Sequence, residues 1–245
     1  MKIKIKETVP TLMTSGNITC GFISILCILN QRFEIAAWLI IAAMIFDAFD
    51  GRLARMMKST SKTGAQLDSM ADLVTFGISP ALLIIKTCNS LPVVILCGIG
   101  LFFMLCSAFR LARFNTEKDK DANIPSHFFT GLPTTLSGGT IAQLVILNHF
   151  LQMRFGTDLV ITLLPFVTFA LGVFMVSKIP FFNVTTKIGI KQGIWAMALE
   201  FSASILFFVI TPELAVSTAL TCYLIICAMY GVVKGKQLKR EYSTT

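Results

Sequence analysis

The stretch "FEIAAWLIIAAMIFDAFDGRLARMMKSTSKTGAQLDSMADLVTFG", residues 33–77, carries the pattern that decides the fold. It begins with an apolar run long enough to cross a membrane as a helix. Two aspartates, Asp47 and Asp50, stand three residues apart at the end of that run, and Asp68 and Asp72 stand four apart in the next apolar segment. Carboxylates inside membrane segments are expensive to bury, so the pattern indicates a functional site.

The rest of the chain is equally apolar. Of its 245 residues, 55% are hydrophobic and 14% are charged, and the mean hydropathy is +0.76. Soluble domains rarely have this composition. We therefore predict an all-α, polytopic helical membrane protein with about eight spans, at roughly 11–29, 33–51, 64–87, 92–112, 131–150, 157–177, 193–211 and 213–233.

The basic residues predict the orientation in the membrane. If both termini lie on one side, that side holds all of the 21 Lys and Arg residues except Arg32, Lys86 and Arg154. Since basic residues concentrate on the cytoplasmic side, both termini are expected there, in an inner or plasma membrane. The net charge of +8 then indicates contact with anionic lipid headgroups, and no nucleic-acid pattern of interleaved aromatics is present.

Helical geometry predicts that the four aspartates meet. Asp47 and Asp50 share one face of the second span, and Asp68 and Asp72 share one face of the third. In an antiparallel pair of spans, all four carboxylates reach a similar depth, just inside the cytoplasmic boundary. Three small residues lie on the same faces and leave room beside the carboxylates: Gly51, Ala54 and Gly64.

Four carboxylates at one low-dielectric place need protons or cations. They suit Mg²⁺, Mn²⁺ or Ca²⁺, and two such ions about 3.5–4 Å apart promote displacement at phosphorus. Arg55 is placed to meet phosphate charge. Two other interpretations stay open: a purely structural helix contact with Arg52 and Arg55, and a proton- or cation-coupled transporter. A transporter predicts broken helices and inverted repeats near the midplane, and the two halves of this chain share no motif.

The run D-x2-D-G-x2-A-R-x8-G-x3-D-x3-D, from Asp47 to Asp72, resembles the signature of the CDP-alcohol phosphotransferase family at every fixed position. The resemblance implies a membrane enzyme, often a homodimer, that moves a phosphoalcohol from a CDP-linked donor to an acceptor hydroxyl and releases CMP. It implies two divalent ions, Mg²⁺ or Mn²⁺, on Asp47, Asp50, Asp68 and Asp72. Asp72 would also be the catalytic general base, and the CDP site would be lined by Gly51, Ala54, Arg55 and Gly64.

Three further stretches resemble the serine-using bacterial and archaeal branch of that family: "LDSMADLVTFGISPA" (67–81), "SAFRLARFN" (107–115) and "FTGLPTT" (129–135). This implies CDP-diacylglycerol, or CDP-archaeol, as donor and L-serine as acceptor; glycerol 3-phosphate or an inositol phosphate is the alternative acceptor. The resemblance predicts a catalytic domain over 1–182, followed by two additional spans and a basic tail over 183–245. Many members begin the first helix with Pro-Asn, whereas this chain has Pro10-Thr11, which leaves Thr14 and Asn17 as its polar groups.

A serine acceptor requires a group that recognises its carboxylate. Arginine supplies a planar fork of donors for that purpose. Arg110 and Arg113 lie on a common face at the cytoplasmic end of the fourth span, and Asn115 follows to take the amino group. The alternative is that both arginines only obey the positive-inside rule.

Overall fold

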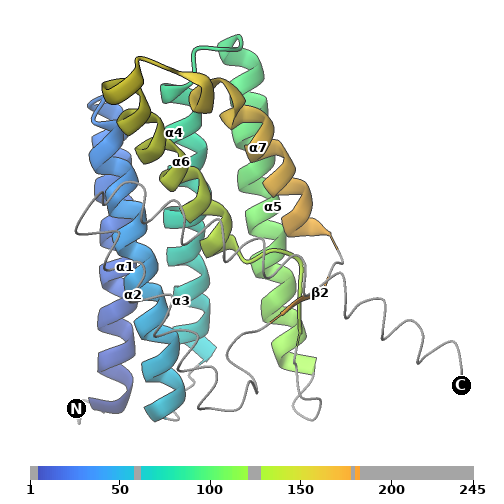
Figure 1. Ribbon diagram of the computed structural model, residues 1–245. Helices are drawn as coiled ribbons and strands as arrows, with labels where there is room; N and C mark the ends of the chain where they lie inside the picture. Colours follow the sequence, from blue (N-terminus) through green and yellow to red (C-terminus); the bar gives the residue numbers. More distant parts are fainter. Residues whose placement is uncertain (1–4, 58–61, 121–127, 178–179, 183–245) are drawn as a thin grey trace, which may run out of the picture.

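The computed structural model covers the whole chain, and it describes residues 5–57, 62–120, 128–177 and 180–182. Within these ranges the chain is almost entirely helical (Figure 1). The elements in chain order are α1 (Ile5–Leu29), α2 (Phe33–Met57), α3 (Lys62–Asp72), a π-helical segment η1 (Leu73–Ile78), α4 (Ser79–Thr87), α5 (Val93–Lys120), β1 (Phe128–Thr130), α6 (Thr134–Phe155), α7 (Leu159–Val176) and β2 (Pro180–Phe182).

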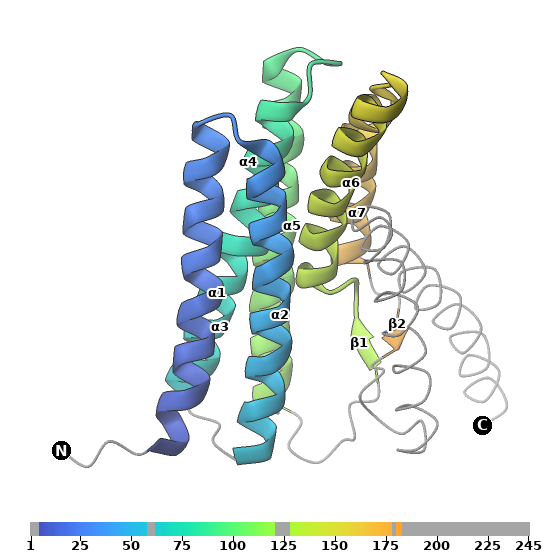
Figure 2. The same ribbon diagram turned by 60° about the vertical axis from the view of Figure 1, so that its left-hand side comes forward.

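The helices stand side by side in a bundle, as Figures 1 and 2 both show. α1 packs along α2, α2 along α6, and α7 lies against both α5 and α6. The six predicted spans that fall within the described ranges are each helical. Most ends lie within a few residues of the prediction, but α1 begins earlier, and α2, α5 and α6 continue further toward their C-termini. The predicted spans 193–211 and 213–233 lie outside the described residues.

Among the residues that the structure describes, four stretches are long and apolar enough to cross a membrane: Leu12–Leu29, Thr63–Thr87, Val93–Thr116 and Leu159–Val176. α2 and α6 are also long, and each carries polar residues. α2 carries Glu34 near its start and aspartates near its end, and α6 contains Gln143 and Asn148, both buried inside the bundle. Large apolar side chains such as Phe22, Phe109 and Phe166 instead point outward, which suits helices surrounded by lipid.

The third predicted span is one continuous helical rod with a wider turn in its middle. α3 passes through η1 into α4 without a break, and η1 begins immediately after Asp72. Thr75, Phe76 and Gly77 in η1 are buried. α6 approaches this segment so closely that a Cβ atom at Gly138 would lie 2.8 Å from the Phe76 carbonyl oxygen. Single π turns inside helices often accompany functional sites, and this one adjoins the acidic residues.

A short two-stranded ladder is the one departure from the all-α prediction within the described residues. β1 and β2 pair antiparallel, with Phe128 opposite Phe182 and Thr130 opposite Pro180. The backbone enters α6 from this ladder through Gly131, whose φ of 86° is favourable only for glycine. Segments of three residues carry no periodic signal, so the sequence did not predict them.

One end of the bundle gathers the segments that carry the predicted site. The start of α1, the end of α2, the start of α3 and the end of α5 lie together there, and the β1–β2 ladder lies at the same end (Figure 1). The connections that contain Arg32 and the residues after Lys86 and Arg154 lie at the opposite end. The alternating direction of the helices therefore brings the polar, charged ends of α2, α3 and α5 together.

Candidate active site

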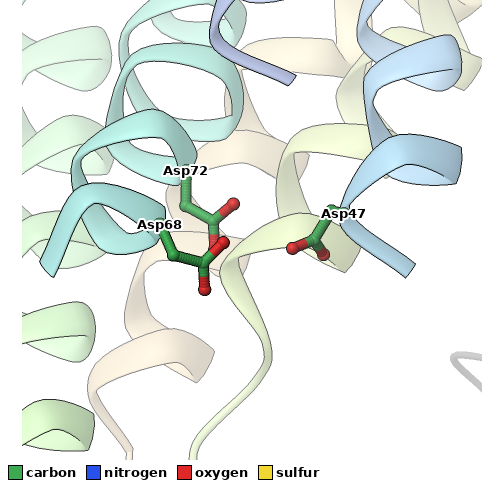
Figure 3. Close-up of side chains that lie close together, drawn as sticks. All are labelled: Asp47, Asp68 and Asp72. Carbon is green, nitrogen blue, oxygen red and sulfur yellow. The ribbon is translucent and has the colours of Figure 1, made fainter. Parts of the chain in front are cut away.

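Three aspartates from two helices converge at this end of the bundle. Asp47 comes from α2, and Asp68 and Asp72 come from α3; one carboxylate oxygen of each lies within 4.8 Å of the others. Figure 3 shows the Asp47 side chain facing Asp68 and Asp72 across a shared space. Asp72 is 7% exposed, and the other two are half-buried. Three of the four carboxylates that were predicted to meet are thus found together.

For most of the other signature residues, the structure describes the backbone but not the side chain. Asp50 lies in α2 about one turn after Asp47, and Gly51, Ala54 and Arg55 follow it in the same helix; their side chains lie outside the described part of the structure. Gly64 lies in the first turn of α3 and is half-buried. The CDP site assigned to Gly51, Ala54, Arg55 and Gly64 therefore stays a prediction.

Asp72 has a direct partner on α1. The Nδ2 atom of Asn17 donates a hydrogen bond of 3.1 Å to Oδ1 of Asp72. Asp72 also interacts electrostatically with Asp47, Asp68 and Arg110. Asn17 is 1% exposed. In the sequence it was visible only as a polar residue in an apolar span, which signals a functional or pairing role without naming the partner.

Arg110 lies at the edge of this acidic cluster, which we define as Asp47, Asp68 and Asp72. Its Nη1 atom donates to Oγ1 of Thr134 at 3.1 Å, and its Cζ atom lies 5.4 Å from the centre of the Phe114 ring. Its charge interacts with those of Asp72 and Asp47. Arg110 thereby joins α5 to the first turn of α6 and supplies positive charge beside the carboxylates.

The other two residues predicted to bind serine have protein partners of their own. Nη1 of Arg113 donates to the carbonyl oxygen of Val176 at 3.4 Å, near the end of α7. Asn115 exchanges hydrogen bonds with Ser69 on α3, with Nδ2 to Oγ at 2.9 Å and Oγ to Oδ1 at 3.2 Å. Arg110 thus interacts electrostatically with the acidic cluster, whereas Asn115 bonds to Ser69, the residue that follows Asp68.

The acidic cluster has the donor chemistry of a divalent-cation site. Carboxylate oxygens are the ligands that Mg²⁺ and Mn²⁺ prefer. Three like charges within 4.8 Å of one another, one on a buried side chain and two on half-buried ones, are stabilised by a cation among them. The Oδ1 atom of Asn17 is buried beside Asp72 and has no hydrogen-bond partner among the described residues. The residues present therefore fit such an ion.

Comparisons with known proteins agree with this chemistry. The model of the family described as CDP-alcohol phosphatidyltransferase matches residues 7–233. A CDP-diacylglycerol–serine O-phosphatidyltransferase of Helicobacter pylori is 32% identical over 228 residues, covering 92% of this chain and 90% of that protein. The enzyme of the same name from Bacillus subtilis is 35% identical over 191 residues, covering 76% and 98%. An archaetidylserine synthase of Methanothermobacter thermautotrophicus is 28% identical over 174 residues, covering 70% and 68%.

Proposed function

The chain belongs to the CDP-alcohol phosphatidyltransferase family, and we propose that it transfers the phosphatidyl group of CDP-diacylglycerol to the hydroxyl of L-serine and releases CMP. The observation that carries this proposal is the convergence of Asp47, Asp68 and Asp72 in a chain that aligns with serine-using enzymes over most of its length. It is an integral membrane protein whose apolar helices would admit the lipid donor from the bilayer.

The alternatives from the sequence are less well supported. Each of the relatives described above is named for serine, which favours serine over glycerol 3-phosphate or an inositol phosphate as acceptor. Membership of a transferase family argues against an ion transporter. The archaeal relative acts on a different lipid, so the shared chemistry of the donor is a CDP-linked lipid, either CDP-diacylglycerol or CDP-archaeol.

The proposed function includes divalent cations, which this family uses. Asp47, Asp68 and Asp72 would hold them, with Asp50 completing the four carboxylates of the signature. When bound, Mg²⁺ or Mn²⁺ would neutralise the negative charge that grows on the diphosphate during transfer. We propose that two such ions bind, and that either Mg²⁺ or Mn²⁺ can fill the site.

Asp72 is proposed as the general base. Its carboxylate would accept the proton of the serine hydroxyl as the serine oxygen forms a bond to the lipid-linked phosphorus and the bond from that phosphorus to CMP breaks. Asp72 is the most buried of the three clustered aspartates, and Asn17 holds it. A single displacement of this kind needs no covalent enzyme intermediate.

We assign recognition of the serine carboxylate first to Arg110. Its guanidinium neighbours the acidic cluster, so a carboxylate bound there would keep the serine hydroxyl near Asp72. Arg113 lies about one helical turn further along α5 and is the second candidate. Asn115 remains a candidate for the amino group, which would require its carboxamide to leave or share the bonds with Ser69.

Replacing Arg110 by Lys should raise the KM for L-serine. The substitution keeps the charge but loses the planar fork, and hydrogen bonds between charged groups contribute about 1.5–3 kcal/mol. We expect a rise of about 10- to 100-fold in the serine KM, with binding of the CDP-lipid nearly unchanged. Arg113→Lys should have the same kind of effect but a smaller one. Steady-state kinetics with each substrate varied in turn measures both; equal weakening of donor and serine binding would contradict the assignment.

The orientation of the protein in the membrane also stays a proposal, supported by the distribution of Lys and Arg. Affinity tags at residues 1 and 245 should be protected from an external protease in intact cells. A tag inserted at Gly156, in the exposed connection between α6 and α7, should be cleaved and serves as the positive control. Cleavage of the tag at residue 245 would contradict a cytoplasmic C-terminus. The homodimer implied by the family resemblance, and the division of the chain at residue 182, stay predictions.

The direct test of the function is CMP release by the purified protein. Protein in detergent or lipid nanodiscs is supplied with CDP-diacylglycerol and a divalent cation, with and without L-serine. Serine-dependent CMP release and formation of phosphatidylserine support the proposal. Parallel reactions with glycerol 3-phosphate, with an inositol phosphate, and with CDP-archaeol as donor identify the acceptor and the lipid. Release that depends on another acceptor and not on serine would overturn the assignment.

A further inference from the structure

The acidic signature lies on α2 and α3, yet the most buried of the three clustered aspartates is held from α1. Asn17 and Asp72 are 55 residues apart in the sequence, and both are buried where their side chains meet. The Asn17 carboxamide donates to Oδ1 of Asp72 at 3.1 Å, which is a normal length for an N–H to O bond. A bond of this kind limits rotation of the carboxylate about its last torsion.

The backbone around Asn17 is itself fixed against the π-helical segment. Oγ1 of Thr75, in the first turn of η1, donates to the carbonyl oxygen of Asn17 at 3.1 Å. One helical turn along α1, a Cβ atom at Gly21 would lie 2.2 Å from Oγ1 of Thr75, so only glycine permits this approach. Two hydrogen bonds therefore link Asn17 to the segment around Asp72. One joins its side chain to Asp72 itself, and the other joins its backbone to Thr75, three residues further along.

The second polar atom of the Asn17 side chain is not used within the described structure. Its Oδ1 atom is buried and accepts no hydrogen bond there. A buried carboxamide normally satisfies both ends, because an unpaired polar atom costs free energy. An apolar residue would pack at this position without that cost. The presence of asparagine therefore points to a role at the acidic cluster.

We propose that Asn17 is a positioning residue for Asp72: its side-chain N–H holds Oδ1 and so fixes how the carboxylate faces Asp47 and Asp68. On the proposed function, which this inference builds on, the same bond orients Asp72 toward the acceptor hydroxyl. α1 thus takes part in the site although it contributes nothing to the acidic signature. Groups that orient a metal-binding carboxylate typically change metal affinity or activity by about 10- to 100-fold when they are removed.

The first experiment uses the full-length protein without substrates. Its thermal unfolding midpoint is followed as Mn²⁺ is added, for the wild type and for Asn17→Ala and Asn17→Leu. Both substitutions remove the N–H donor, while leucine keeps the branched outline and the number of heavy atoms of the asparagine side chain. We expect the Mn²⁺ concentration for half-maximal stabilisation to rise about 10-fold in both variants. A return to the wild-type value in Asn17→Leu would show that Asn17 only fills space, which would overturn the proposal.

Ser24→Ala is the matched control. Ser24 lies two turns further along α1, is fully buried, and bonds to the Ala36 carbonyl oxygen at 2.9 Å and to the Ser79 hydroxyl at 2.8 Å. Its removal costs a similar interhelical contact away from the acidic cluster. We expect Ser24→Ala to lower the unfolding midpoint but to leave the Mn²⁺ dependence within about twofold of the wild type. An equal shift in Mn²⁺ dependence in this control would assign the effect to general loosening of α1 and would overturn the proposal.

The second experiment measures transfer to serine at saturating Mn²⁺. Both Asn17 variants should lower kcat by about 10-fold, with the KM for L-serine and for the CDP-lipid changed less than about threefold. A rise in KM without loss of kcat would show a substrate-binding role and contradict positioning. If the wild type transfers nothing to serine, the proposed function fails, and the substrate-free Mn²⁺ titration still decides the inference. If the wild type is active and the Asn17 variants match it in both measurements, the inference fails alone.

Discussion

Removal of divalent cations is expected to abolish CMP release, and Mg²⁺ or Mn²⁺ should restore it. The reason is the acidic cluster, in which one oxygen from each of Asp47, Asp68 and Asp72 lies within 4.8 Å of the others. Without cations, these carboxylates repel one another and would also repel a diphosphate. A bound cation contributes several kcal/mol of charge stabilisation during displacement at phosphorus. Since about 1.4 kcal/mol corresponds to a factor of ten, the loss of rate should exceed about 100-fold.

The measurement is CMP release after dialysis against EDTA, followed by titration with Mg²⁺ and with Mn²⁺ separately. Circular dichroism of the dialysed protein is the control, because it shows whether the helices survive and the loss of activity is specific. Elemental analysis establishes that the ions were removed. Full activity of folded, cation-free protein would exclude a metal-dependent reaction and leave the acidic cluster to a structural role.

The sequence predicted the acidic cluster because helical geometry is nearly invariant. Asp68 and Asp72 are four residues apart and must share a face of α3, and α2 ends at the same end of the bundle at which α3 begins. The position of Asp47 near the end of its apolar run then fixes its depth to within about a turn. No knowledge of side-chain packing is needed for this argument, which is why it succeeded.

Features that depend on contacts between distant segments were not predicted. The π-helical turn at Leu73–Ile78 arises where α1 and α6 approach closely at Gly21 and Gly138, and a local pattern cannot express that. The partners of Arg113 and Asn115 are likewise tertiary, since Val176 and Ser69 are 63 and 46 residues away. The bond from Asn17 to Asp72 belongs to the same class, and the sequence showed only that α1 carried a polar residue.

Asp72→Asn is expected to lower kcat by about 10²- to 10⁴-fold, the usual effect of losing a general base. An amide has nearly the shape of a carboxylate and retains one oxygen ligand, but it cannot accept a proton at neutral pH. The amide oxygen of the substituted side chain could still accept the N–H of Asn17, so the local packing should survive. Donor binding, measured as stabilisation against heat by the CDP-lipid at saturating cation, should therefore be retained.

Asp68→Asn provides the matched comparison on the same helix. Asp68 also belongs to the acidic cluster but is more exposed than Asp72. We propose that it only holds the cation, so its substitution should weaken stabilisation by the CDP-lipid, and excess Mg²⁺ or Mn²⁺ should partly restore both stabilisation and rate. Excess cation should restore little of the rate of Asp72→Asn, because added cation cannot accept the serine proton in place of the missing carboxylate.

A cation titration of both variants therefore separates the two roles of a carboxylate in this site. A ligand defect moves the concentration of cation required for activity, whereas a base defect lowers the rate reached at saturation. The burial of Asp72 and its bond to Asn17 make it the better held of the two, which suits a group that must meet a particular hydroxyl. If excess cation rescues Asp72→Asn as well as it rescues Asp68→Asn, then Asp72 is only a ligand. In that case the proton of the acceptor must pass to water or to another group.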